Sequence, residues 1–394
     1  MRGKPLFSNL QYCTRCCMPE TQEGIKFDEM GVCQACQSAE QKIHIDWTKR
    51  EYKLREIIKN AKSEAGSNYD CIIPISGGKD SMFQLFVLVK EYGMKPLAVT
   101  FDYGWYSETG TYNLINCLEK FNVDHIKFSV NRELIKRLAK RSLSCIGDSC
   151  WCCHAGLGAF PLKIAVKFNI PLLIWGESIA EASARATYFD PVRRYDREYF
   201  TKVSAKLSAD EMICDYLSET DLNPFQIPSA EECKRAGVYG IHLGDYMFWD
   251  EQRQTEFLVK HYDWKESAME GTYKSYKGVE CIMVGVHDFT CYLKRGYGRA
   301  SFHASIDVRH GLLTREEGFA LARQHDPIRP HALDYYLMAA GMDEDEFYKI
   351  MEKQKVLQLK NIELPVYKNT EKHLEVLIPI GEQYVEKYKY CKMY

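Results

Sequence analysis

The sequence has no long apolar run. No segment approaches the roughly 20 consecutive apolar residues that a membrane-spanning helix requires. The first residues, Met1 to Leu6, are followed by no apolar stretch, so we expect no signal peptide. An excess of positive charge is also lacking: the net charge is −2, which gives no general attraction for nucleic acid. These absences predict a cytoplasmic protein with no membrane partner, and they argue against DNA or tRNA as the main substrate.

Cysteine, in contrast, is abundant, with 16 residues in a chain of 394. Disulfide frameworks are typical of small secreted domains, whereas this chain is large and carries no export signal. Its cysteines also cluster, so metal ligands or reduced thiols are the better interpretation. The length favours two or three domains, and 46% hydrophobic with 27% charged residues is typical of a soluble globular protein.

The first cysteine cluster has the spacing of a zinc site. Two Cys-x2-Cys pairs are separated by 16 residues and supply four thiolates: Cys13, Cys16, Cys33 and Cys36. Four sulfur ligands leave Zn²⁺ no open position, so the expected role is structural. We therefore predict a zinc-knuckle module over residues 1–45.

Alternating strand and helix patterns follow. Apolar runs predict strands over 69–75, 95–101, 124–130 and 170–175, and helices over 46–65, 81–92, 109–121, 132–141 and 155–168. Such repeated units predict an α/β domain over residues 46–190, with a doubly wound parallel sheet. Beyond residue 190 the pattern is irregular and aromatic. Residues 191–394 are therefore expected to form a helical region for substrate or partner, with helices over 312–324 and 343–358.

A glycine loop joins the first predicted strand to its helix. It reads Ser76, Gly77, Gly78, Lys79, Asp80 and Ser81. Glycines at a helix start let backbone N–H groups approach an anion, and the helix dipole favours negative charge there. Lys79 adds a charge for phosphate, and Asp80 is either a partner of Mg²⁺ or a structural partner. The spacing is not that of a Walker loop. Asp102 lies at the end of the second strand, where an aspartate is typical of the cap of a loop. The family resemblance given below implies instead a place near ATP.

A second cysteine cluster precedes the helix predicted at 155–168. It contains Cys145, Cys150, Cys152 and Cys153. A helix N-terminus lowers a thiol pKa. Three interpretations stay open: a second metal or iron–sulfur site, reactive thiols, or buried structural cysteines.

Two further sets of polar residues follow. Glu177 comes directly after the strand at 170–175 and is a candidate for positioning ATP or substrate. The segment 294–311 is rich in basic residues and glycine, and its candidates for substrate or phosphate contact are Arg299, His303, Asp307 and Arg309. By pattern alone, a solvated charged loop is the favoured interpretation of this segment.

The loop from Ser76 to Ser81 resembles the signature of the pyrophosphatase-loop family, whose fold is that of the adenine nucleotide α-hydrolases. Further resemblance extends over the zinc knuckles, residues 170–177, 244–250, 285–288 and 294–315. Together these segments are similar to the N-acetyl sugar amidotransferases of surface-polysaccharide biosynthesis, the type found in pseudaminic acid, legionaminic acid and O-antigen pathways.

This resemblance implies an enzyme that cleaves ATP to AMP and pyrophosphate, with Mg²⁺. The acetamido group of a sugar or nucleotide sugar would be adenylated on oxygen, and ammonia would displace AMP to leave an acetamidino group. Lys79, Asp80 and Glu177 would act in catalysis. The ammonia is expected from a separate glutaminase with a cyclase-like subunit.

A sulfur transferase is the alternative. The pair Cys150 and Cys153 resembles the Cys-x2-Cys pair of sulfur-inserting tRNA enzymes, which supplies catalytic thiols or iron–sulfur ligands. Near-neutral charge and the segment 294–315 favour nitrogen chemistry instead.

Overall fold

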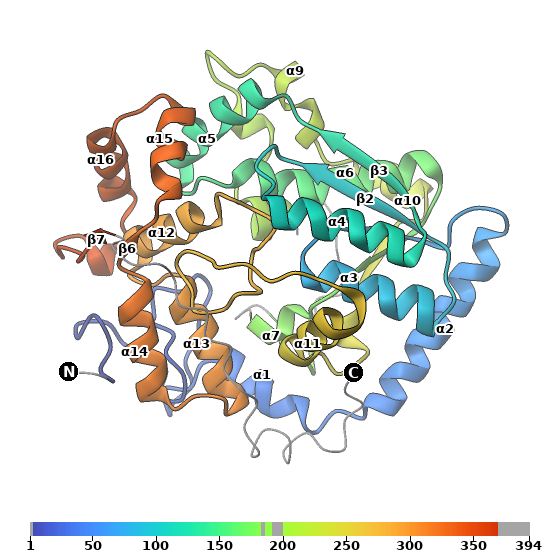
Figure 1. Cartoon of the computed structure of the whole chain (residues 1–394), viewed down its shortest axis with the longest axis horizontal. Coiled ribbons are helices and arrows are strands. Elements are labelled where there is room, and N and C mark those ends of the chain that lie inside the picture. Colours follow the sequence, from blue (N-terminus) through green and yellow to red (C-terminus); the bar gives the residue numbers. More distant parts are fainter. Residues whose placement is uncertain (1–2, 183–185, 191–199, 369–394) are drawn as a thin grey trace.

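A five-stranded sheet forms the centre of the computed structural model, which describes residues 3–182, 186–190 and 200–368 (Figure 1). The strand order is β3-β2-β1-β4-β5, and every neighbouring pair is parallel. The strands are β1 (Cys71–Pro74), β2 (Pro96–Asp102), β3 (Asp124–Ser129), β4 (Leu172–Trp175) and β5 (Tyr239–His242). The predicted parallel α/β fold is confirmed.

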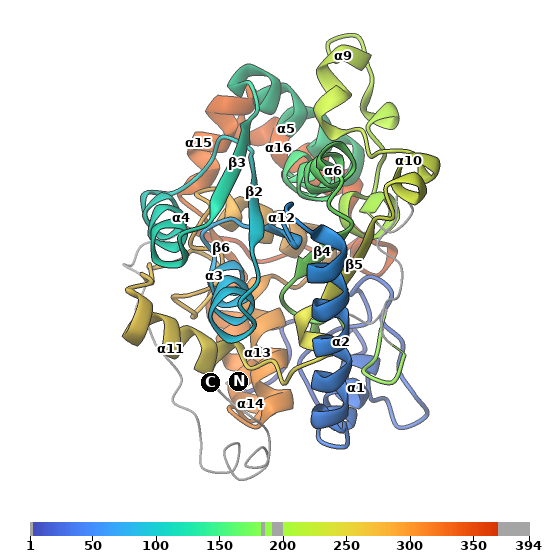
Figure 2. The same ribbon diagram turned by 90° about the vertical axis from the view of Figure 1, so that its right-hand side faces the viewer.

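Helices cover both faces of this sheet because successive strand side chains point to opposite sides. Ile73 packs on one face with α2 (Trp47–Ala65), α3 (Lys79–Leu85) and α4 (Glu108–Phe121). Ile72 packs on the opposite face against α6 (Trp151–Phe168). Figure 2 shows α3 and α4 on one side of β2 and α6 on the other. The sheet is therefore doubly wound.

Several predicted boundaries need correction. The helix expected at 81–92 starts at Lys79 and continues from Phe86 to Glu91 as a π-helical turn, η1. Helix α5 (Arg132–Ile146) runs longer than predicted, and α6 starts four residues earlier than 155, at Trp151. Strand β5 was missed, because Tyr239–His242 is short and contains a glycine, which weakens the strand pattern.

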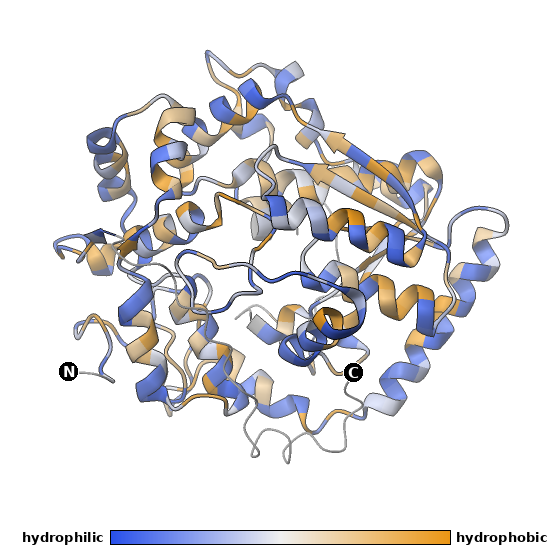
Figure 3. Cartoon of the chain, viewed as in Figure 1, coloured by the Kyte–Doolittle hydropathy of each residue, from blue (hydrophilic) through white to orange (hydrophobic). Residues whose placement is uncertain are grey.

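The N-terminal part ends in α1 (Gln34–Lys42), which leads into α2. The Asp46 side chain accepts a hydrogen bond from the backbone N–H of Lys49 and caps α2. In Figure 3 α2 is mostly hydrophilic, whereas the central strands are mostly hydrophobic. Within the described ranges, we find no helix with the length and apolarity needed to cross a membrane.

The remaining described residues are mainly helical. A capping box at Thr314 starts α14, and Asp343 caps α16, so the two helices predicted at 312–324 and 343–358 are present with shorter bounds. The elements are α7 (Ile179–Ala182), η2 (Phe200–Ala205), η3 (Asp210–Met212), α9 (Glu219–Leu222), η4 (Asn223–Phe225), α10 (Ala230–Arg235), η5 (Leu243–Asp245), α11 (Glu251–Tyr262), α12 (Val284–Arg295), α13 (Arg299–His310), α14 (Arg315–His325), β6 (Ile328–Arg329), α15 (Ala332–Ala340), α16 (Glu344–Gln354), η6 (Leu357–Leu359) and β7 (Tyr367–Lys368).

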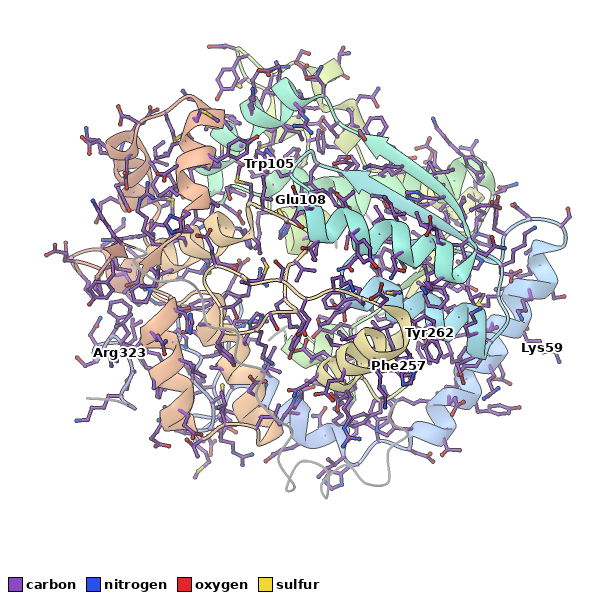
Figure 4. The ribbon with its side chains drawn as sticks, in the orientation of Figure 1. Lys59, Trp105, Glu108, Phe257, Tyr262 and Arg323 are labelled. Carbon is purple, nitrogen blue, oxygen red and sulfur yellow. The ribbon has the colours of Figure 1, made fainter. Side chains whose placement is uncertain are left out.

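Aromatic packing holds α11 beside the sheet helices. Phe257 and Tyr262 of α11 both contact Phe86, with ring centroids 4.8 and 5.6 Å away (Figure 4). Tyr262 also stacks on Phe121 of α4 at 5.1 Å. Because α11 is fixed in this way, its first residue, Glu251, is held close to the start of α3.

Candidate active site

The glycine loop lies at the switch point of the sheet. Strand β1 has β2 on one side and β4 on the other, and chain connections diverge between β1 and β4. Ligands of open α/β sheets bind beyond the carboxyl ends of strands at such a point. The loop follows β1 and Glu177 follows β4, so the sheet brings together two features that the sequence predicted separately.

Close backbone approach explains the glycines of the loop. Gly77 has φ of +83°, and a side chain there would meet the carbonyl oxygen of Gly110 at 2.4 Å. The indole of Trp264 donates a hydrogen bond to the carbonyl of Gly77 at 3.0 Å and fixes the turn. No side chain caps the start of α3 at Gly78. The first N–H groups of this helix are therefore available to an anion.

Lys79 is buried, with 3% of its surface exposed, and is surrounded by carboxylates. Its Nζ lies 2.7 Å from Asp80 and 3.5 Å from Glu251. Burial disfavours the charge, but these two carboxylates raise the pKa of Lys79 above its ordinary value. The lysine is thus a fixed positive charge beside the loop.

A chain of buried ion pairs continues from Lys79 into the C-terminal region. Glu251 contacts Lys277 and lies 3.6 Å from Lys274, and Lys274 lies 2.6 Å from Asp307 of α13. The hydroxyl of Tyr273 also donates to Asp307, at 2.5 Å. Burial opposes charge on Glu251, yet the three lysines hold its pKa well below the ordinary value. Asp307, one of the predicted substrate residues, is therefore connected to the phosphate loop.

His303 lies beside this chain, one helical turn before Asp307. Its Nδ1 is 2.7 Å from the hydroxyl of Thr272, and its buried Nε2 has no hydrogen-bond partner among the described residues. Burial and the nearby positive charge of Lys277 lower the pKa of His303 well below its ordinary value, so the ring is neutral. A buried polar atom without a partner marks a place where a ligand group would be accepted.

Arg299 pairs with Asp288. Its Nε lies 2.9 Å from both carboxylate oxygens, and this pair holds the guanidinium at the start of α13. Its positive charge also lowers the pKa of His303, after burial and Lys277. Arg299 and His303 thus share one region of the site.

Glu177 is partly buried and close to the loop charges. Burial, together with repulsion from Glu251 and Asp80, raises the pKa of Glu177 from 4.5 to about 7. A carboxyl group with such a pKa exchanges protons near neutral pH, and this property is typical of catalytic acids and bases.

Glu280 approaches the loop from the C-terminal region. A side chain on Gly78 would meet the Glu280 carboxylate at 3.4 Å. The backbone N–H of Ile282 donates to the carbonyl of Trp105 at 3.0 Å. The backbone N–H of Ser107 donates to the carbonyl of Glu280, also at 3.0 Å. Burial and the nearby Asp80 raise the pKa of Glu280. Asp80 and Glu280 together offer oxygen ligands for Mg²⁺ near the loop.

Two predicted site residues have their contacts elsewhere. Asp102 accepts hydrogen bonds from Gly104 at 2.7 Å and Ser129 at 3.1 Å and pairs with Lys127 at 2.8 Å. These contacts fit the loop-cap interpretation. Arg309 donates to the thiol of Cys16 at 3.8 Å and to the carbonyl of Glu181 at 3.4 Å. Arg309 therefore lies at the cysteine module, and a contact of either residue with ATP or substrate stays a prediction.

The four N-terminal cysteines form one buried group. Their ligand atoms all lie within 4.8 Å of one another, and the Sγ atoms of Cys13 and Cys36, and of Cys16 and Cys33, are 3.8 Å apart. Sulfurs at 2.3 Å from a tetrahedral ion are separated by about 3.8 Å, so the group fits a single Zn²⁺. It forms a metal-type cysteine cluster where the sequence predicted one.

This cluster packs on α13 and α14. Arg315 donates to the carbonyls of Cys13 at 2.8 Å and Cys16 at 3.0 Å. The thiol of Cys17 points to the carbonyl of Arg315, at 3.5 Å, and is not part of the four-cysteine group. Two arginines, Arg309 at the Cys16 thiol and Arg315 at the carbonyls, thus bring positive charge to the four-cysteine group.

The second cysteine cluster is divided by the structure. Cys150 forms a group with Asp148 and His287, whose ligand atoms lie within 4.8 Å of one another. Cys145, Cys152 and Cys153 are not members of this group. Burial raises the pKa of Cys152 and Cys153 well above the ordinary thiol value, so both stay protonated.

Sequence reasoning missed Glu251, Lys274, Lys277 and Glu280. Lys274 and Lys277 lie three residues apart in an aromatic segment without helix periodicity, and this pattern alone is only a weak signal of a site. Glu251 follows the quoted segment 244–250 directly, but no local pattern connects it to Lys79. These residues meet only through tertiary packing.

The sheet and loop give the class of fold first: the chain is a parallel α/β protein with a glycine loop after its central strand, an arrangement that many nucleotide-binding proteins use. Residues 270–372 then match the family described as LPS biosynthesis protein WbpG-like, C-terminal domain. This matched segment contains Lys274, Arg299, His303 and Asp307. The C-terminal part of the chain is thus similar to a lipopolysaccharide-biosynthesis domain.

Two individual proteins are also similar. A stretch of 105 residues is 30% identical to an uncharacterized protein of Methanocaldococcus jannaschii, covering 27% of this chain and 37% of that protein. The chain therefore spans little more than a third of that relative. The structure of NMN synthetase from Francisella tularensis resembles the chain with a TM-score of 0.29 and 15% identity, over 55% of this chain and 87% of that one.

Proposed function

We propose that the protein is an ATP-dependent amidotransferase of surface-polysaccharide biosynthesis. It adenylates the acetamido oxygen of an N-acetyl sugar or nucleotide sugar, and ammonia then displaces AMP to leave an acetamidino group. The observation that carries this proposal is the buried ion chain from Lys79 through Glu251 and Lys274 to Asp307. It joins the phosphate loop to the segment that matches the lipopolysaccharide-biosynthesis family.

The charges suit an α-phosphate reaction. Lys79 and the uncapped N-terminus of α3 stabilise the negative charge that develops on phosphate during adenylation. Asp80 and Glu280 would hold Mg²⁺, which when bound would neutralise negative charge on the phosphates of ATP. The amide oxygen is a weak nucleophile, and its adenylation turns it into a good leaving group.

The C-terminal residues suit a sugar. The unpartnered Nε2 of neutral His303 would bond a hydroxyl or the acetamido group of the sugar. The charge of Arg299, fixed by Asp288, would orient a sugar-linked phosphate. Glu177, with its pKa of about 7, would take the proton that ammonia loses as the C–N bond forms.

Sulfur transfer receives less support. A sulfur carrier needs an ionisable, accessible thiol, but Cys153 is held protonated by burial. The four-cysteine module is the better metal site, and its buried closed geometry supports a structural Zn²⁺. We infer that the ammonia comes from a separate glutaminase and cyclase-like subunit, as the resemblance implies.

A direct assay tests the reaction class. Purified protein is incubated with ATP, Mg²⁺, an ammonium salt and a panel of acetamido sugars and their nucleotide derivatives, and pyrophosphate release is followed. Nitrogen-for-oxygen exchange lowers the product mass slightly, whereas sulfur insertion raises it. Pyrophosphate release that depends on one sugar and on ammonium supports the proposal. Sugar-independent release, or a heavier product, would overturn it.

A matched pair of variants connects the assay to the site. Lys274→Met removes the lysine between Glu251 and Asp307, and Lys265→Met removes an exposed lysine that pairs with Asp263 at the surface. We expect loss of turnover in the first variant and near-normal turnover in the second.

A further inference from the structure

We propose a second metal site, built by Asp148, Cys150 and His287, with one exchangeable coordination position. The three side chains offer a carboxylate, a thiolate and an imidazole, and their ligand atoms lie within 4.8 Å of one another. This proposal does not depend on the proposed function, because it concerns ion binding alone.

Three separate elements bring the ligands together. Asp148 lies in the short connection between α5 and α6, Cys150 is the N-cap of α6, and His287 lies in the first turn of α12. The Oδ1 of Asp148 accepts the backbone N–H of Cys150 at 2.8 Å and lies 2.8 Å from Nδ1 of His287.

The convergence of the atoms distinguishes a metal site from a nucleophilic triad. In a Cys-His-Asp triad the two ring nitrogens face opposite partners, so sulfur and carboxylate oxygen lie about 7 Å apart. Here the sulfur and the carboxylate oxygen are within 4.8 Å of each other and of the ring nitrogen. Ligand atoms around one zinc ion are about 3.3–3.8 Å apart, a spacing that small side-chain movements would reach.

A cavity beside the cluster provides the open position. Its volume is about 270 Å³, and Asp148, His287 and His154 are among its lining residues. His154 lies in α6, one helical turn after Cys150. Its ring centroid is 5.4 Å from that of His287. Lys206, Lys294 and Arg295 also line the cavity, together with Glu23, which pairs with Lys206 at 2.8 Å and with Arg295 at 3.2 Å. Three protein ligands with a fourth position open to a cavity are characteristic of exchangeable zinc sites, and a water molecule suits that position.

Metal content tests the proposal on the full chain without a histidine tag. We expect two zinc equivalents per chain. Loss of one equivalent in each of Cys150→Ser and His287→Ala, with both retained in Cys145→Ser, would support the second site; Cys145 lies close in sequence but outside the group. Folding is checked by circular dichroism. A folded His287→Ala variant with wild-type zinc content would overturn the proposal.

X-ray absorption on the wild-type protein gives a test that requires no variant. The measured coordination shell is an average over both zinc sites. One site has four sulfur ligands and the other has sulfur, nitrogen and oxygen, so we expect fewer than four sulfurs per zinc. An all-sulfur shell would show that the four-cysteine module alone holds metal, and would contradict the second site.

Discussion

Lys274 forms a buried ion pair with Asp307, with 2.6 Å between Nζ and Oδ1 and with both side chains nearly inaccessible to solvent. One partner lies in the irregular segment before α12 and the other in α13. Through Glu251 this pair also reaches Lys79. The buried charge of Lys79 in the glycine loop and the segment that resembles a polysaccharide-biosynthesis domain are therefore joined by one chain of ion pairs.

Breaking that pair should destabilise the fold. Asp307→Ala leaves the Lys274 charge buried without its closest partner, and such losses cost about 3–5 kcal/mol. We expect a lower midpoint in urea unfolding. The double variant Lys274→Met with Asp307→Leu removes both charges and should recover part of this loss while remaining inactive. Equal destabilisation of the single and double variants would contradict the buried-pair interpretation.

The glycine loop should tolerate no side chain at Gly77. Gly77→Ala puts a Cβ within 2.4 Å of the Gly110 carbonyl at a φ of +83°, and the left-handed conformation alone costs about 1–2 kcal/mol. Thermal protection by ATP and Mg²⁺ should disappear in this variant. Gly66→Ala is the control: it has similar positive φ and no atom within 4 Å of the added carbon, and it should keep ATP protection.

Glu177 predicts a pH dependence of stability. Its folded pKa of about 7 lies above the ordinary 4.5, so the folded protein favours the protonated form. The contribution of Glu177 to the free energy of unfolding is therefore most favourable below pH 4.5, and it is lost as the pH rises through 7. Glu177→Gln stays neutral at every pH. Above pH 7 its free energy of unfolding should exceed that of the wild type by on the order of 1 kcal/mol, and its unfolding temperature should be higher. The two proteins should be alike at low pH; the same difference at every pH would contradict this account.

Loss of a metal ligand in the four-cysteine module should destabilise the packing of α14 on that module. Cys33→Ser removes one ligand, and Arg315 then loses the rigid carbonyls of Cys13 and Cys16 that it bonds. We expect loss of one zinc equivalent and increased proteolysis near α14. Cys17→Ser is the matched control because its side chain faces Arg315 and not the cluster; this variant should keep its zinc. Loss of zinc in both variants would contradict the assigned ligands.

Local patterns were sufficient for part of this architecture. The strands around Ile73, the glycine loop and the Cys13 to Cys36 spacing depend on neighbours in sequence, and each is present as predicted. Strand β5 is too short to show a period, and its place beside β4 depends on packing.

The arrangement of the candidate site depends on contacts between residues far apart in the sequence, so it was harder to predict. Asp307 and His303 were selected from a basic segment, but only the fold shows that Lys274 and Glu251 connect them to Lys79. Arg309 looked equivalent to Arg299 in sequence, yet it lies at Cys16 because α13 presents the two side chains to different neighbours. Likewise, Cys150 meets Asp148 and His287 through tertiary packing, a contact to His287 that the local Cys-x2-Cys spacing does not show.

Isotope transfer tests the central claim most directly. An acetamido sugar that supports turnover is labelled with ¹⁸O in its acetyl carbonyl and converted with ATP and ammonium, and the AMP is examined by mass spectrometry. If the amide oxygen attacks the α-phosphate and leaves with it, AMP carries the label and the sugar product carries none. Unlabelled AMP, or label retained in the sugar, would contradict adenylation of the acetamido group.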